Sequence, residues 1–149
     1  MKSVIVALLG LLTCAAPSLT PPEGAWRSNR DITLAELRQE RSFTPEQWRM
    51  LSSPELFGHM IYVLYRGSAI TVYEGECSEP MTYEVDPAAG RIRFAASESD
   101  GSVLVALDGD RIRVPISILP GRLSETFKRT DLGAVMDRHP CVKDFVSRH

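Results

Sequence analysis

The sequence predicts a mainly β protein: a small antiparallel up-and-down β-barrel of about eight strands, with short helices after the first strand and at the C-terminus. From Gly58 onward, apolar residues recur at every second position, which is typical of strands with one buried face. Turn signals at Gly67-Ser68, 87–90 and Asp108-Gly109 divide these strands into three hairpins. Two flanking segments raise the number to eight, which is enough to close a small barrel.

The six hairpin strands are expected at 60–64, 69–74, 82–86, 91–96, 103–107 and 111–116. The second hairpin has one apolar face, formed by Tyr83, Val85, Ile92 and Phe94. Residues 25–28 are expected to add the first strand and 123–130 the last. The segment 123–130 also fits a helix capped by Ser124, but its alternation favours a strand.

Three helix-start signals follow the first strand. Thr33–Glu36 and Thr44–Gln47 both have the capping-box pattern, and Ser53-Pro54 is a third start. They predict short helices at about 34–41, 45–51 and 54–57. The tail is expected to form helices at 132–138 and 142–147, broken at Pro140.

The N-terminus has the pattern of an export signal. One positive charge at Lys2 precedes a short apolar run, which is too short to span a bilayer. We expect a signal segment at 1–14, a Pro-rich linker at 15–23 and one domain at 24–149. A buried N-terminal strand or helix is the alternative. The predicted location is the periplasm.

Cys14 follows Leu11-Leu12-Thr13, a spacing that resembles a bacterial lipobox. Thr13 departs from the small residue usual before the lipidated cysteine. Simple cleavage after Ala15 therefore remains the alternative. If Cys14 is acylated, the lipid would anchor the domain to the outer membrane.

Charge and motif content argue against several classes of function. The net charge of −2 and the absence of a block of basic residues predict no nucleic-acid binding. His59, His139 and His149 are the only histidines, and none belongs to a catalytic or zinc-binding motif. We therefore expect no metal, no cofactor and no enzymatic activity.

Cysteine counting predicts one disulfide. Of the three cysteines, Cys14 belongs to the leader, which leaves Cys77 and Cys141 in the domain. An even pair in an oxidising compartment favours a disulfide, and two unpaired buried thiols are the alternative.

The beginning and end of the domain share several short motifs with a known superfamily. They are Gly24-Ala25-Trp26, the run Trp26-Arg27-Ser28-Asn29 before Thr33, Asp108-Gly109-Asp110 before Val114-Pro115, and 125–129. Over about 24–130 the chain resembles small bacterial exported lipocalin-like proteins of the calycin superfamily. The resemblance implies a barrel with an apolar interior, in which Trp26 crosses the closed end and packs on Arg129 as a structural pair. The helical insert departs from a typical lipocalin and is expected to cover one mouth.

The expected function is to bind a small hydrophobic molecule or lipid inside the barrel. The inward residues expected to line the site are Tyr62, Leu64, Tyr83, Val85, Phe94 and Val114. Their alternative role is core filling, since eight strands enclose a space that side chains can fill. The rival function is an envelope interaction or inhibitor module with a solid barrel. Its contact surface would include the strand arginines Arg91, Arg93, Arg111 and Arg113.

The leader yields the first testable prediction. Metabolic labelling with a fatty-acid analogue should label the mature protein, and Cys14→Ser should abolish the label, because the Leu-x-x-Cys spacing places Cys14 at the processing site. An unlabelled, soluble periplasmic product beginning at Ala16 would contradict the prediction.

Overall fold

The computed structural model describes residues 22–95, 103–116 and 123–149. The predicted signal segment, Cys14 and all but the end of the linker lie outside these residues. In the described part, no helix has the length and apolar character needed to cross a membrane.

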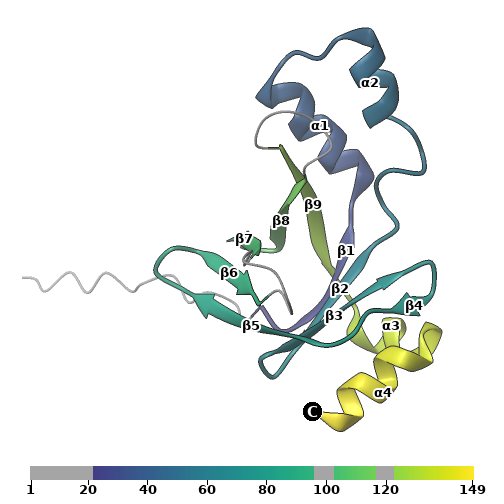
Figure 1. Cartoon of the computed structure of the whole chain (residues 1–149), viewed down its shortest axis with the longest axis vertical. Helices are drawn as coiled ribbons and strands as arrows, with labels where there is room; N and C mark the ends of the chain where they lie inside the picture. Colours follow the sequence, from purple (N-terminus) through teal and green to yellow (C-terminus); the bar gives the residue numbers. More distant parts are fainter. Residues whose placement is uncertain (1–21, 96–102, 117–122) are drawn as a thin grey trace, which may run out of the picture.

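Eight strands form a closed antiparallel barrel, as the sequence predicts (Figure 1). The strands are β1 (Gly24–Ser28), β2 (Ile61–Tyr65), β3 (Ser68–Tyr73), β5 (Met81–Asp86), β6 (Arg91–Phe94), β7 (Val103–Asp108), β8 (Arg111–Ile116) and β9 (Leu123–Thr130). Each strand pairs with its neighbours in the chain, and β1 pairs with both β2 and β9, while β2 also pairs with β3. No barrel strand is therefore left at an edge.

A ninth strand, β4 (Glu76–Cys77), was not predicted. It pairs with the end of β3, whereas β5 pairs with the start of β3. β4 and β5 therefore lie one after the other along the same edge of β3. Between them, Ser78 N–H donates to the Thr71 carbonyl at 2.9 Å, and Thr71 N–H donates to Ser78 Oγ at 3.0 Å. β4 has only two residues, too few for a period-two pattern to show in the sequence.

Alternation along the strands separates two apolar cores. The inner one fills the barrel and is built around Trp26, Leu64, Phe94 and Phe127. The outer one lies between the outward faces of β1, β2 and β3 and the C-terminal helices, and it includes Ile61, Val63, Ile70, Val72, Val142 and Phe145. The strands that carry the C-terminal helices are thus apolar on both faces.

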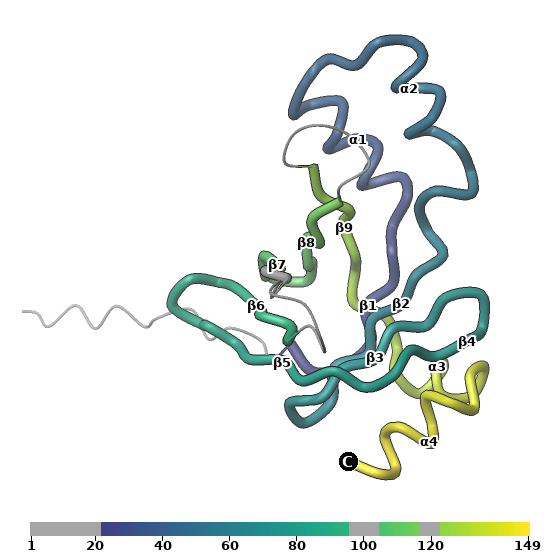
Figure 2. The backbone as a smooth tube through the Cα atoms, viewed as in Figure 1, coloured from purple at the N-terminus to yellow at the C-terminus, as the bar shows by residue number. Residues whose placement is uncertain are grey.

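Two helices stand between β1 and β2: α1 (Arg30–Glu40) and α2 (Pro45–Leu51). They project from one end of the barrel, and the chain then returns into β2 (Figure 2). The capping box at Thr44 and Gln47 is confirmed. The helix expected at 54–57 is wrong, since these residues form a turn.

The capping box expected at Thr33 and Glu36 is also wrong. The helix starts earlier because Asn29 accepts the cap hydrogen bond from Ile32 N–H at 3.0 Å. Thr33 lies within α1, and its hydroxyl accepts the N–H of Thr126 on β9 at 3.0 Å. Glu36 bonds the Thr126 hydroxyl as well. Both residues therefore attach α1 to the barrel.

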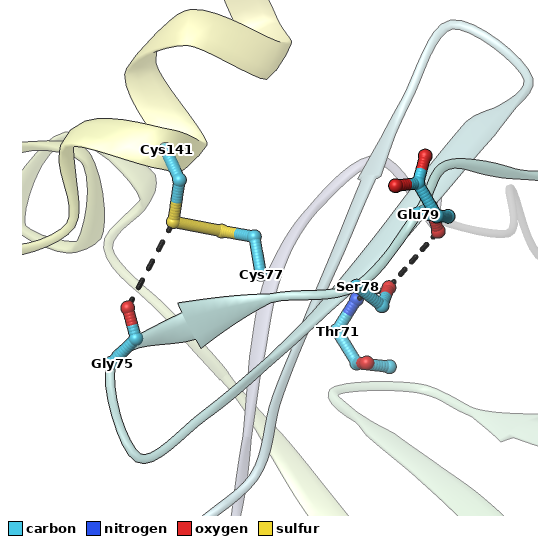
Figure 3. Close-up of a disulfide and its surroundings, with 6 residues drawn as sticks. All are labelled: Thr71, Gly75, Cys77, Ser78, Glu79 and Cys141. Carbon is cyan, nitrogen blue, oxygen red and sulfur yellow. Dashed lines mark hydrogen bonds between the residues drawn. A yellow bond between two sulfur atoms is a disulfide. The ribbon is translucent and has the colours of Figure 1, made fainter.

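The tail forms α3 (Leu132–Arg138) and α4 (Pro140–Arg148), with Pro140 at the first turn of α4. The predicted disulfide between Cys77 and Cys141 is present, with the two Cα atoms 6.2 Å apart. Figure 3 shows it joining α4 to β4. It closes a loop spanning 64 residues, which the chain-entropy model values at about 4 kcal/mol.

The expected pairing of Trp26 with Arg129 is confirmed. The two residues are direct neighbours across β1 and β9, and the guanidinium carbon lies 4.3 Å from the indole centroid. Trp26 is fully buried, and its Nε1–H donates to the Pro22 carbonyl at 2.8 Å. Gly24 has φ +127°, and a Cβ there would lie 3.0 Å from Arg129 Nη1. This close approach explains glycine two residues before the tryptophan.

The pair gives a stability prediction. Trp26→Ala should lower the free energy of unfolding by about 3–5 kcal/mol, the cost of truncating a large buried side chain. With Arg129→Ala and the double mutant, urea unfolding should show a coupling of about 0.5–1 kcal/mol, the size of a cation–π contact with an exposed guanidinium. Additive effects would contradict a direct interaction.

Candidate functional site

The barrel interior has two chemically different ends. The clasp end contains the start of β1 and the Trp26–Arg129 pair, with the turn between β2 and β3 at Arg66-Gly67. The insert end lies where β1 leaves for α1, and it contains Ser28 on β1 and Glu125 on β9. Its rim is covered in part by the helical insert, since Leu123 and Ile116 pack with Leu37, Leu51 and Phe57.

An aromatic layer lies between the two ends. The Tyr62 ring contacts Phe94 and Phe127, with centroids 5.6 and 5.1 Å apart, and Tyr83 contacts Phe94 at 6.2 Å. Phe127 is fully buried, and Phe94 is nearly so. These rings fill the middle of the barrel and separate the clasp end from the insert end.

A polar group faces inward at the insert end. The Ser28 hydroxyl donates to Glu125 Oε1, and the Gly58 N–H donates to Ser28 Oγ at 2.7 Å. Glu125 follows the inward alternation of β9, two residues before Phe127. A carboxylate inside an otherwise apolar barrel is costly unless it is paired or has a ligand to bind.

The surroundings raise the pKa values of both titratable groups here. Burial raises the pKa of Glu125, although hydrogen bonds from Ser28 and the Gly58 backbone and the charge of His59 oppose the rise. Burial also raises the pKa of Tyr62, and the charge of Glu125 adds to it. The two side chains therefore share one poorly solvated space.

The six predicted ligand residues divide between the two ends. Tyr62, Phe94 and Val114 lie toward the insert end, with Val114 opposite Glu125 across β8 and β9. Leu64 is fully buried opposite Gly24, at the clasp end. Tyr83 also points there: burial raises its pKa, while a hydrogen bond from the Gly67 backbone opposes the rise. Val85 is 37% exposed beyond the clasp end.

Exposure within the interior is uneven. Leu64, Ile92, Ile112 and Phe127 are fully buried, as expected of a packed core. Tyr62 and Met60, which pack on the same cluster, keep part of their surface accessible, and so does Glu125. The accessible inward surface thus gathers beside the Ser28–Glu125 pair.

The strand arginines proposed as a protein-binding surface lie on the outside, in two unlike pairs. Arg111 and Arg113 both contact Glu36 Oε1 at 3.1 Å and so hold α1 on the barrel. Arg91 and Arg93 are exposed and face Asp86 and Glu84 across β5 and β6. They line a surface hollow of about 270 Å³. Of these four, Arg91 and Arg93 are the more exposed pair, whereas Arg111 and Arg113 are half-exposed and already paired with Glu36.

Sequence reasoning missed Ser28 and Glu125 as site residues. The alternation of 123–130 already put Glu125 in one row with Phe127, so an acidic residue in an inward row was the available signal. Ser28 gave no such signal, because its partner lies 97 positions away in the chain. Among the described residues, no group of three or more His, Cys, Asp or Glu side chains is placed to hold a metal ion.

Comparison of the chain with protein-family models, curated proteins and solved structures found no match.

Two carboxylates give opposite predictions for stability against pH. Burial raises the pKa of Glu36, but bonds from Thr126 and Arg113 and the charges of Arg113 and Arg111 outweigh it, so its pKa lies below 4.5. The folding stability that Glu36 contributes is present above pH 4.5 and lost as the pH falls through its lowered pKa. Glu125 has a raised pKa, so the folding stability that its protonated form gives is present below pH 4.5 and lost as the pH rises through that raised pKa.

At pH 7 we therefore expect Glu36→Gln to lower the free energy of unfolding by about 1–2 kcal/mol, given its half-exposed arginine partners. Glu125→Gln should raise it by about 1 kcal/mol, because a neutral side chain replaces a partly buried charge. Urea unfolding between pH 3 and 8 measures both. A loss of stability at pH 7 in Glu125→Gln would contradict the assigned cost.

Proposed function

We propose that this protein is a lipocalin-like binding protein of the cell envelope, without enzymatic activity, which holds a small apolar ligand at the insert end of its barrel. The observation that carries the proposal is the Ser28–Glu125 hydrogen bond next to the inner apolar core, two residues from Trp26 and from Phe127. Ligand sites are mostly apolar with a few polar groups that fix orientation, and this pair has that character. The barrel alone supports many functions.

The packing around the pair supports a compact ligand. Tyr62, Phe94 and Phe127 provide an aromatic floor, and Val114 provides part of one wall. Below this floor, the clasp end is filled by Trp26 and its neighbours. A ligand with one ring or a short chain therefore fits the proposal better than a long acyl chain.

The rival proposal, a protein-interaction module, is supported by a different surface. On the helical insert, the Arg38 guanidinium lies 4.3 Å from the Trp48 ring centroid, and the Arg41 guanidinium lies 5.0 Å from that of Phe43. These residues line a surface hollow of about 340 Å³. Tryptophan and arginine are enriched at binding hot spots. The hollow lies away from the barrel interior, so the two proposals can be tested separately.

Ligand binding is tested with 2-phenylethanol, a neutral one-ring probe. In an amide-shift NMR titration we expect saturable shifts at Tyr62, Phe94 and Val114. Val114→Phe should weaken binding at least about tenfold, because the larger ring fills the space beside Glu125. Val85→Phe is the matched control and should bind normally, since Val85 lies outside the opposite end.

Binding that is lost equally in both variants, or an interior that gives no saturable shift, would remove the ligand proposal. The module proposal would then take its place, to be tested by substitution of Trp48.

A further inference from the structure

Glu125 is the one carboxylate among the inward residues of the described strands. The nearest inward cation on its own strand is Arg129, four residues along β9, which at about 3.3 Å per residue is about 13 Å away. That guanidinium lies at the clasp end, over Trp26 and against the Glu23 carbonyl. It is therefore too distant to neutralise Glu125.

The groups that contact Glu125 leave its carboxylate able to accept further hydrogen bonds. Ser28 donates to Oε1, and Gly58 N–H holds the Ser28 hydroxyl in that orientation. His59 lies near enough for its charge to act on Glu125, but its Nε2 is 2.8 Å from the Pro54 carbonyl and the residue is exposed. An ionised carboxylate only accepts hydrogen bonds, so a ligand that meets it must bring donors.

The walls favour the same kind of ligand. Tyr62 keeps part of its ring accessible beside Glu125, and a ring face attracts a cation. The fully buried Phe127 limits the depth to which an apolar group can enter. Together these features describe a short apolar group attached to a positively charged donor.

We propose that the insert end of the barrel binds a small primary amine, with its ammonium group on Glu125 and a compact apolar group against the Tyr62 ring. This inference rests on the proposed function, of which it names the ligand class. The ammonium donates to the carboxylate oxygens, and Ser28 orients the carboxylate. Tyr62 contacts the ligand, whereas Tyr83 lies at the opposite, clasp end of the barrel and does not.

The test compares three probes of nearly equal size that differ in the polar group: 2-phenylethylamine, 2-phenylethanol and phenylacetate. Each is titrated at pH 7.5 and low salt into the full domain, with amide shifts as the readout. We expect the amine to bind at least about tenfold more tightly than the alcohol, since charge-assisted hydrogen bonds are roughly twice as strong as neutral ones. Phenylacetate should bind most weakly, because two carboxylates repel each other.

The variant Glu125→Gln keeps the shape of the side chain and removes its charge. It should reduce the preference for the amine over the alcohol to about twofold or less. Glu84→Gln is the matched control, since Glu84 is an exposed residue on the outward face of β5. It should leave the preference unchanged, and circular dichroism should show that both variants are folded.

The outcomes separate the two proposals. If the alcohol binds but the amine is not preferred, or if the preference survives in Glu125→Gln, the amine inference is wrong and the ligand-binding proposal stands. If none of the three probes binds saturably, both proposals fail. Tight binding of phenylacetate would also overturn the amine inference, because it would require a cation at the site.

Discussion

The structure depends on the position of β1 between β2 and β9. This one strand turns an open meander into a barrel, and its register with β9 places Trp26 directly opposite Arg129. The indole fills the clasp end, its N–H is satisfied by the Pro22 carbonyl, and the guanidinium covers its face. Gly24 makes room for that guanidinium. Because both sheet edges are removed at once, the barrel needs no further partner to protect it.

The same register sets the chemistry of the insert end. Fixing Trp26 inward also points Ser28 inward, two residues later, where Glu125 meets it from β9. The interior therefore has a filled, structural end and an end with accessible polar and aromatic surface. A buried carboxyl group with a raised pKa costs stability at this position, and our proposal gives that group a ligand to bind. Stability would favour an apolar residue at that position.

The helical insert and the C-terminal helices are held on the outside of the barrel by different kinds of interaction. The helical insert is held through polar contacts, in which Thr33 and Glu36 bind Thr126 and the strand arginines. The C-terminal helices are held by apolar packing and by the disulfide. This difference explains why Arg111 and Arg113 serve the fold, although their exposure on a strand first suggested a surface for a partner.

The sequence by itself determined the hairpins, the closing strand at 123–130, the Thr44 cap, the Cys77–Cys141 pairing and the contact of Trp26 with Arg129. These follow from period-two alternation, from turn and cap chemistry and from cysteine number, or from a motif resemblance. Tertiary structure alone decided that Thr33 joins a helix to a strand, that β4 exists, and that Tyr62 and Tyr83 face opposite ends. It also decided that Ser28 meets Glu125. Alternation tells which face of a strand is buried, but the height of a side chain in the barrel and its partner depend on strand register and closure, which join residues far apart in the chain.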